Sequence, residues 1–507
     1  MLRDVPIVGH FTPAPTVAQL SAMDALSVDI PRQYPELAAD SQFRCLMPES
    51  LDDGACLHLD DLSEITYLDG GREFRFIQDR ARMRAGDGDL VASVAPEVAG
   101  YEAYCQQQLG LGAPEWLRVA PGDDRVRVAQ ACWKDRRVRR TLVHRMRTNR
   151  LDYLHPHMGT FGVWELGALL QQHSRRPLKV IGAPPALSRL VNHKVTFADV
   201  VSQLLGRRFI PLTASVWNMA TLCERVADLA VSARMIGLKR PRSAGGDAIV
   251  ILPAGLLRGQ SLQEINLVLE PSVRRLQWTG DSDLLINSWE TDVLCSPSAQ
   301  IWIPTEADGP PIVEGIFAQL LDYHATVFVG TVEAELPSDL TREFATYSWL
   351  LARLFQRLGY VGRCSFDAIL VGESLEHSRL EFVECNGRWG GASLPMTLMN
   401  RIFGDWRTKP YAARVLKVEG LSRIAFPRLL QLLRSDLYDR HTGRGRLIVT
   451  TPGYLYQQSA ISVLALGESR RDASEYLCRA VPVLLKRAVE SGVAVAENDG
   501  ESLISTP

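Results

Sequence analysis

The feature that most constrains this chain is the stretch of residues 379–395, RLEFVECNGRWGGASLP. Apolar and then polar residues stand at alternate positions along it: Leu380, Phe382, Glu384, Asn386 and Arg388. Alternate side chains of a strand point to one face, so this spacing predicts that all five share a face. The apolar end would pack on a core. The polar end would project a carboxylate, an amide oxygen and a guanidinium into one cleft.

The polar end of this stretch has the chemistry of a metal and phosphate site. Mg²⁺ prefers carboxylate and amide oxygens and keeps its remaining positions for water and phosphate. The planar guanidinium of Arg388 can bind a phosphate through two hydrogen bonds. Gly390 and Gly391 allow the backbone to approach a substrate closely. The alternative is an ion pair between Glu384 and Arg388 on an edge strand, and spacing alone favours neither interpretation.

Length and composition narrow the classes of protein that remain. The 507 residues suggest about three domains, and a net charge of −2 argues against duplex DNA or an anionic membrane as partner. Nine cysteines are scattered singly without a CxxC pair, which favours a reducing compartment. Neither a signal-peptide core nor a membrane-spanning apolar run occurs. We therefore expect a soluble, cytoplasmic protein.

The first 190 residues alternate short apolar runs with turn-rich breaks, which predicts an α/β layer domain. The expected strands are Phe43–Met47, Glu64–Tyr67, Leu90–Val94 and Val126–Gln130, and the expected helices are Val98–Gln108 and Val163–His173. The basic run Lys134–Arg150 is best interpreted as the solvated face of a helix. As a nucleic-acid patch it lacks interleaved aromatic residues. A site for an anionic substrate is the remaining alternative.

Two lysines stand in segments that could face a nucleotide. Residues 186–205 have helical spacing and contain Lys194. Residues 233–252 predict a hairpin with Lys239 and Arg242 near its tip, where four residues expose backbone N–H groups: Ser243, Ala244, Gly245 and Gly246. Such a loop can fold over phosphates, although an ordinary glycine-bearing hairpin is the alternative. It is not the nucleotide P-loop, because no GxxxxGK[ST] is present.

Further elements follow toward residues 379–395. A helix over 260–277, broken at Pro271, precedes strands over 283–290 and 298–303 and a helix over 338–358. Two strands around a polar turn at 372–378 then form a hairpin that places Asp367 near Glu384. A third oxygen ligand facing Glu384 and Asn386 is what a two-metal phosphoryl-transfer site needs. After residue 421 a helix, two strands and a helix predict a small α/β unit with a polar, disordered tail.

This order of a helix lysine, a glycine-loop lysine, an acid-bearing hairpin and E-x-N-x-R resembles the ATP-grasp enzymes, across about residues 188–403. Four segments resemble the pheganomycin-type peptide ligases: NHKVTFADVVSQLLG, LKRPRSAGGD, CSPSAQIWIP and EFVECNGRWGGASLP. The resemblance implies an α/β (α+β) chain in three parts. These are a Rossmann-like pre-ATP-grasp domain (1–187), an ATP-grasp core (188–420) and a small C-terminal α/β domain (421–507).

The resemblance also implies roles for individual residues. Nucleotide phosphates would be bound by Lys194, Lys239, Arg388 and the loop Ser243, Ala244, Gly245 and Gly246. Adenine would be contacted by Asn287, Trp289 and Glu290. Two magnesium ions would be held by Asp367, Glu384 and Asn386. Arg388 and Lys239 would be the catalytic residues, and the substrate would be met by Arg363, Gly390 and Gly391. D-alanine ligases place an arginine two residues before the first metal acid, where this chain has Ser365, and Arg363 is the candidate substitute.

The implied reaction is ATP-dependent amide-bond formation through an acylphosphate, with release of ADP and phosphate. In the resembled family the acid is an unusual N-blocked or guanidino amino acid and the amine is a peptide N-terminus, in the biosynthesis of natural products such as antibiotics. Three alternatives stay open: a carboxylate kinase or biotin-carboxylase-like enzyme, a non-enzymatic nucleotide-binding module, and a nucleic-acid-binding protein resting on the basic run. A homodimer is among the assemblies left open.

Overall fold

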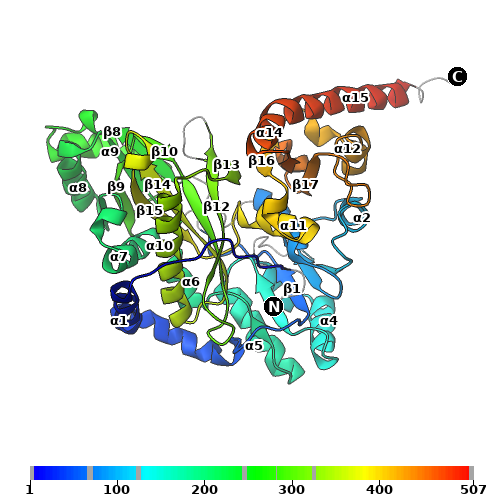
Figure 1. Cartoon of the computed structure of the whole chain (residues 1–507), viewed down its shortest axis with the longest axis horizontal. Coiled ribbons are helices and arrows are strands. Elements are labelled where there is room, and N and C mark those ends of the chain that lie inside the picture. Colours follow the sequence, from blue (N-terminus) through cyan, green and yellow to red (C-terminus); the bar gives the residue numbers. More distant parts are fainter. Residues whose placement is uncertain are drawn as a thin grey trace.

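The computed structural model describes residues 5–65, 72–120, 127–242, 248–280, 282–322 and 327–501. Within these residues the strands form three sheets (Figure 1). A parallel sheet comes from the N-terminal part of the chain, a small antiparallel sheet from the middle, and a large sheet from residues 293–466. None of the described helices combines the length and apolarity that a membrane crossing requires.

The N-terminal sheet has five parallel strands in the order β3-β2-β1-β4-β5. Its strands are β1 (Cys56–Leu59), β2 (Leu90–Ser93), β3 (Glu115–Arg118), β4 (Tyr153–Pro156) and β5 (Lys179–Val180). The helices α3 (Val128–Lys134), α4 (Arg136–Arg147) and α5 (Phe161–Ser174) cover one face. Leu57 and Leu59 point into that helical layer, so Cys56 and His58 point to the opposite face.

Several predictions for this part of the chain can be compared with the structure. The strand at 90–94 and the helix at 163–173 are confirmed. The helix at 98–108 is confirmed from Tyr101 onward, as α2 (Tyr101–Ala103) continued by the π-helix Tyr104–Gln108. The strand predicted for Phe43–Met47 is wrong, because Phe43 and Leu46 bury their side chains from a 3₁₀ helix, η1 (Pro35–Leu46). The strand predicted at Val126–Gln130 is also wrong where it is described, since α3 begins at Val128. Of the strand predicted at Glu64–Tyr67, residues 64–65 form a turn and a bend, and the rest lies outside the described residues.

Most of the basic run, residues 136–147, forms the helix α4. It buries three residues four positions apart, Val138, Leu142 and Met146, while its arginines cover the remaining faces. Asp135 caps its N-terminus by accepting hydrogen bonds from the backbone N–H groups of residues 137 and 138. The helical interpretation of this run is therefore confirmed.

The small antiparallel sheet has the order β6-β9-β7-β8 and is covered by two helices. Its elements are β6 (Thr213–Val216), α8 (Met219–Ser232), β7 (Met235–Lys239), β8 (Ile249–Pro253), α9 (Leu262–Arg275) and β9 (Leu284–Trp289). The predicted hairpin is the β7–β8 pair, with Lys239 opposite Ile249. The break predicted at Pro271 is wrong, because α9 continues through this exposed proline. A missing N–H bond on the solvent side bends a helix without ending it.

The large sheet has the order β10-β14-β11-β12-β13-β16-β18-β17, with β15 paired to β14. Its strands are β10 (Val293–Cys295), β11 (Pro297–Ile303), β12 (Ile312–Leu321), β13 (Phe328–Glu333), β14 (Gly362–Val371), β15 (Arg379–Asn386), β16 (Tyr411–Lys417), β17 (Leu447–Thr451) and β18 (Ala460–Leu466). The helices α1 (Val17–Gln33), α7 (Lys194–Leu204) and α10 (Ser338–Arg357) share one core with β11, β14 and β15. In Figure 1 the small sheet lies at the far left and the C-terminal helices lie at the upper right.

The C-terminal part of the chain adds strands to this large sheet. β18 pairs with β16, and β17 pairs with β18, so residues 447–466 extend the sheet that begins at 293. The helices α12 (Phe426–Leu432), α14 (Arg470–Glu475) and α15 (Val481–Glu501) follow in the order expected. The helical backbone of α15 reaches Glu501, beyond the point where the sequence predicts disorder. The division of the chain into three domains stays a prediction.

Candidate functional site

One large cavity, of about 910 Å³, lies between the small sheet, the large sheet and the N-terminal part of the chain. It has the volume of a site for a ligand the size of a nucleotide or larger. Eleven predicted site residues line it: Lys194, Lys239, Asn287, Trp289, Glu290, Asp367, Glu384, Asn386, Arg388, Gly390 and Gly391. Ser243, Ala244, Gly245 and Gly246 lie outside the described residues. Predicted site residues that lie as far apart in sequence as Lys194 and Gly391 therefore line the same cavity.

The acidic part of the cavity is built on the β14–β15 hairpin, in which Asp367 is paired with Glu384. The predicted proximity of these two residues is therefore confirmed. The pairing shifts register between Asp367 and Ala368, so that Ala368 is opposite Phe382. This irregularity inserts Val383 as an extra residue of β15, as in a β-bulge.

The register shift corrects the prediction that alternate residues of β15 share one face. Leu380 and Phe382 are buried in the core beneath α10, where Phe382 contacts Phe344. Glu384 and Asn386 instead line the cavity with Asp367. The extra residue reverses the alternation, so the apolar and polar ends of the strand face opposite sides of the sheet.

Hydrogen bonds hold the three oxygen-bearing side chains together. Asn386 Nδ2 donates to Asp367 Oδ2 at 2.8 Å and approaches Glu384 Oε1 at 3.5 Å. Ser298 Oγ donates to Asp367 Oδ1 at 2.6 Å, and Gln300 Nε2 donates to Ser298 Oγ at 2.9 Å. The sequence analysis missed Ser298 and Gln300. Their signal was the alternation of polar residues in the predicted strand 298–303.

The two carboxylates differ in their protonation. Burial, and then the negative charge of Glu384, raises the pKa of Asp367 to about 7. Burial alone would also raise the pKa of Glu384, but Lys194 and Arg388 more than offset it, and the pKa is lowered. One carboxylate of the pair is therefore ionised at neutral pH and the other is poised near its midpoint.

The two lysines approach the acids from separate elements. Lys194 is the first residue of α7, and its Nζ lies 2.7 Å from Glu384 Oε2. Its backbone N–H donates to Pro241 O at 3.1 Å, which joins the helix to the β7–β8 connection. Lys239 ends β7 with its ammonium 4.9 Å from the centre of the Trp289 ring. Burial and the positive charge of Lys194 lower the pKa of Lys239 to about 8.

A helix break, rather than the single predicted helix over 186–205, positions Arg388. The chain forms α6 (Pro185–Val191), turns at Asn192 and His193, and resumes as α7. Asn192 Oδ1 accepts hydrogen bonds from Arg388 at 2.6 Å and from the Gly387 backbone at 3.0 Å. A Cβ on Gly387 would come within 2.8 Å of Asn192 Nδ2. The sequence analysis missed Asn192, which is the C-terminal capping residue of α6, although asparagine is a signal of a helix end.

The residues predicted to meet adenine line another wall of the cavity. Asn287 is buried, donates to Ser288 O at 2.6 Å, and leaves Oδ1 without a hydrogen-bond partner among the described residues. Glu290 is ion-paired with Arg379 at 2.7 Å. Trp289 lies under the Lys239 ammonium. A buried amide oxygen at a cavity wall is available to accept a hydrogen bond from a ligand.

Arg363 is placed differently from the other predicted residues. Its side chain is fully buried, forms an ion pair with Glu314, and does not belong to the cavity lining. The guanidinium packs beside the rings of Trp302 and Trp389, at 5.4 and 5.0 Å from their centres. Burial lowers its pKa to about 9. Trp389 lies on the cavity wall, so Arg363 is behind that wall.

The cavity continues past the acids into an apolar region that the sequence analysis did not find. Leu62, Ile65, Ile77 and Tyr454 line this region, and Arg80 and His157 are its polar members. These residues come from the N-terminal segment and from the turn after β17, which the polypeptide brings together only in the folded state. A pattern within one segment could not have indicated them.

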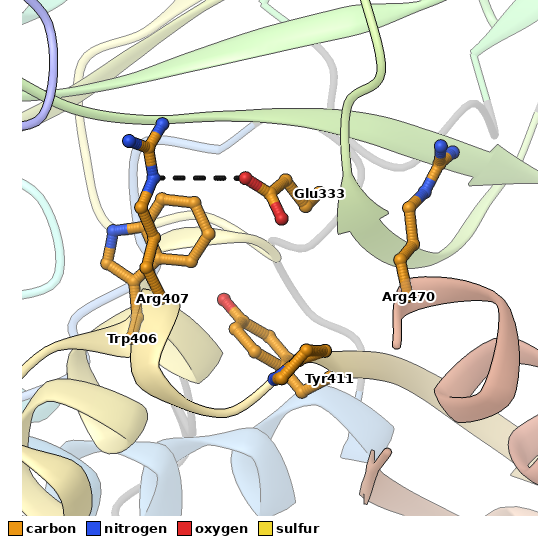
Figure 2. A pocket seen from close by; sticks show the side chains of 6 residues that line it. Glu333, Trp406, Arg407, Tyr411 and Arg470 are labelled. Carbon is orange, nitrogen blue, oxygen red and sulfur yellow. Dashed lines mark ion pairs between the residues drawn. The ribbon is translucent and has the colours of Figure 1, made fainter. Parts of the chain in front are cut away.

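A second pocket, between β13 and β16, is shown in Figure 2. Arg407 Nε lies 3.8 Å from Glu333 Oε1 at its edge, and Trp406, Tyr411 and Arg470 complete the wall. Its volume is about 10 Å³, which is room for about one water molecule. It is too small for a substrate.

The sheets and the cavity define the class of this protein. A small antiparallel sheet faces a large sheet across a cavity with two lysines and three oxygen ligands, and a parallel sheet precedes them. This is the ATP-grasp fold. No protein-family model matches the sequence, and a search of curated proteins also gives no match.

Solved structures share the architecture at low sequence identity. N5-carboxyaminoimidazole synthase from Aspergillus clavatus, in complex with ADP and 5-aminoimidazole ribonucleotide, has a TM-score of 0.50 and 10% identity, covering 86% of this chain and 99% of that one. The biotin carboxylase domain of Hydrogenobacter thermophilus 2-oxoglutarate carboxylase has a TM-score of 0.49 and 13% identity, covering 83% and 88%. N5-carboxyaminoimidazole synthetase from Staphylococcus aureus has a TM-score of 0.48 and 9% identity, covering 85% and 98%. The likeness to the Aspergillus enzyme establishes the fold.

Proposed function

We propose that this protein is an ATP-dependent carboxylate–amine ligase that forms an amide bond and releases ADP and phosphate. The observation that carries the proposal is the convergence of Lys194, Lys239, Asp367, Glu384 and Asn386 on one cavity. Two ammonium groups and three oxygen ligands form the set that phosphoryl transfer from a nucleoside triphosphate requires. The Aspergillus enzyme with this fold holds ADP, which supports a nucleotide in the corresponding cavity.

The acidic residues suit magnesium by their chemistry. Asp367 and Glu384 offer carboxylate oxygens, and Asn386 offers Oδ1 once its amide turns away from the acids. Burial, and next the negative charge of Glu384, raise the pKa of Asp367, and a divalent cation would relieve the repulsion between the two carboxylates. Mg²⁺ bound there would neutralise charge on the transferring phosphoryl group. We propose that these three residues hold two ions.

The residues of the chain would then act on the substrates. A substrate carboxylate oxygen attacks the γ-phosphorus, the bond to ADP breaks, and an acylphosphate forms. The amine nitrogen next attacks the acyl carbon, phosphate leaves, and the amine proton passes to solvent. Lys194, Lys239 and Arg388 would stabilise the phosphoryl charge in the first step. Gly390 and Gly391 would let the backbone approach the acyl group.

The other predicted nucleotide contacts belong to the same proposal. Asn287, Trp289 and Glu290 would contact adenine, with the unpartnered Asn287 Oδ1 as acceptor for its amino group. Ser243 to Gly246 would donate backbone N–H groups to the β- and γ-phosphates.

For the acid, we propose an unusual N-blocked or guanidino amino acid, and for the amine a peptide N-terminus, in natural-product biosynthesis. The apolar region around Ile65 and Tyr454 supports an acceptor site larger than a single small molecule such as ammonia. The alternative is a carboxylate kinase or carboxylase that shares the ATP half of the site. Both use Lys239 and Glu384, and they differ in the species that attacks the activated carboxyl group.

A product assay tests the proposal. The full chain would be incubated with Mg²⁺, ATP and mixtures of amino acids and peptides, and products identified by mass spectrometry beside assays for ADP and AMP. An amide product formed in proportion to ADP supports the ligase. AMP as product would point to adenylation, and ADP with acylphosphate or carboxylated product but no amide would favour the alternative.

A further inference from the structure

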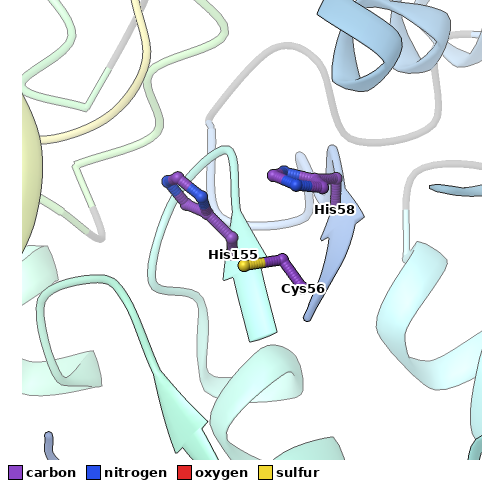
Figure 3. A group of neighbouring side chains, drawn as sticks. All are labelled: Cys56, His58 and His155. Carbon is purple, nitrogen blue, oxygen red and sulfur yellow. The ribbon is translucent and has the colours of Figure 1, made fainter. Parts of the chain in front are cut away.

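A second cluster of potential metal ligands, which shares no residue with the acids of the cavity, lies on the N-terminal sheet (Figure 3). Cys56 and His58 are two apart on β1, and His155 is directly opposite His58 on the neighbouring strand β4. Both strands turn these side chains to the face opposite the helices α3–α5. One ligand atom from each of the three residues can be chosen so that all lie within 4.8 Å of one another.

The imidazoles of this cluster are buried, and three of their four nitrogens lack a hydrogen-bond partner among the described residues. His58 is 1% exposed and His155 is 0% exposed. Both nitrogens of His155 and Nδ1 of His58 have no hydrogen-bond partner among the described residues. A buried polar nitrogen without a partner is costly, and such groups in native proteins commonly indicate a bound ion or water.

Asp89 gives His58 the orientation of a metal ligand. Its Oδ2 lies 3.2 Å from His58 Nε2, and the carboxylate is fixed by the backbone N–H groups of Cys56 at 2.8 Å and Gly86 at 3.0 Å. A hydrogen bond from Nε2 to the carboxylate leaves the lone pair of the neutral ring on Nδ1, which is then the nitrogen available to a metal. A carboxylate behind a histidine is the usual support of a metal-binding imidazole.

The charges around the cluster suit a divalent cation. Three guanidinium groups lie near the cluster. That of Arg84 is ion-paired with Asp60 at 2.8 Å, that of Arg363 is ion-paired with Glu314, and that of Arg401 donates to the backbone oxygens of residues 83, 85 and 111. Asp89 and a Cys56 thiolate then supply the two negative charges that a divalent ion requires.

We infer that Cys56 Sγ, His58 Nδ1 and a ring nitrogen of His155 bind a zinc-class transition metal, with the thiol proton released to solvent as the metal–sulfur bond forms. One thiolate and two imidazoles are the donors that Zn²⁺ selects over Mg²⁺. The ion would join β1 to β4 directly behind the cavity wall, because the His155 ring lies 5.5 Å from that of Trp389. The site is independent of the proposed ligase activity.

Cobalt substitution of the full chain tests the inference. After metal is removed with a chelator, one equivalent of Co²⁺ is added, and a thiolate-to-cobalt charge-transfer band in the near ultraviolet is expected. Cys56→Ser should abolish this band, and His155→Gln should abolish or markedly weaken it. Cys105→Ser, at another buried cysteine, should retain it. Glu384→Gln should also retain it, which separates this site from the acids of the cavity.

Metal analysis of the untreated protein gives a second readout that needs no variant. About one zinc per chain is expected after gel filtration. Wild-type protein without a charge-transfer band, or a Cys56→Ser variant that keeps it, would overturn the inference. If a variant fails to fold, the wild-type spectrum and metal content still decide the question.

Discussion

Replacing Asp367 by asparagine is expected to stabilise the folded chain by an amount that grows with pH. The carboxyl group has an ordinary pKa of 3.8 and is raised to about 7 in the fold by burial and by Glu384. The folded state therefore holds this proton more tightly than the unfolded state does. Stability is lost as pH rises from about 4 through 7, and asparagine removes that loss because it does not ionise.

The magnitude follows from the two pKa values. At pH 8 the full difference of about three pH units applies, and the wild-type carboxylate costs about 4 kcal/mol. At pH 5 the unfolded chain has lost most of this proton, and the cost is already about 1.5 kcal/mol. The advantage of the variant should therefore increase by about 2.5 kcal/mol between pH 5 and pH 8. Water in the cavity screens the carboxylates and reduces the size of the effect without changing its sign.

Urea denaturation without magnesium and nucleotide measures this difference, with tryptophan fluorescence following the transition that exposes Trp302 and Trp389. Comparing variant and wild type at each pH cancels the contributions of all other carboxylates. Asp228→Asn, at an exposed carboxylate of α8, is the matched control and should show a small difference that changes little with pH. A difference for Asp367→Asn that is constant or shrinks from pH 5 to pH 8 would refute the placement of Asp367 beside Glu384.

Three further outcomes are expected. Glu384→Gln should lower the rate of ADP release at least about a hundredfold with the circular dichroism spectrum unchanged. Glu381→Gln, on the same strand but outside the cavity lining, is the control and should keep most activity. An active Glu384→Gln enzyme would disprove the metal assignment. Lys239→Ala should weaken ATP binding in titration calorimetry more than it weakens binding of the acid. The affinity of the wild type for ATP should fall as pH rises through about 8, where the ammonium of Lys239 is lost. A variant that binds ATP as tightly as the wild type would contradict the phosphate role of Lys239. Asn192→Ala should reduce kcat by releasing Arg388, with a smaller loss of ATP affinity because Lys194 and Lys239 still bind the phosphates. Unaltered kinetics would show that Arg388 needs no such support.

The residues of the candidate site could be predicted from the sequence because each of them stands in a recognisable local pattern. Glu384 and Asn386 end an apolar strand, and the polar turn before that strand places it beside Asp367. Lys239 ends an apolar run before a glycine-rich connection. Each pattern depends on neighbours within a few residues, and the ATP-grasp resemblance supplied the long-range order.

The parts that failed depend on contacts that a local pattern does not contain. The break at Asn192 interrupts continuous helical spacing, and it occurs where that side chain is needed by Arg388 and Gly387, nearly two hundred residues away. Phe43 lies in a short apolar run that fits a strand or a helix equally well. In the structure it packs against Trp164 from the helix η1. The apolar end of the cavity joins Ile65 to Tyr454 across most of the chain.

The register shift at Val383 shows which energies determine the sides of β15 on which Phe382 and Glu384 lie. A regular strand would place Phe382 and Glu384 on the same side, either both in the core under α10 or both in the cavity. An unpaired carboxylate in the core costs several kcal/mol, and exposing Phe382 forfeits about 2–3 kcal/mol of burial. An extra residue in β15 sacrifices roughly one ladder hydrogen bond, about 1 kcal/mol. The irregular strand is therefore the least costly arrangement, and it is the one that brings Glu384 to Asp367 and Lys194.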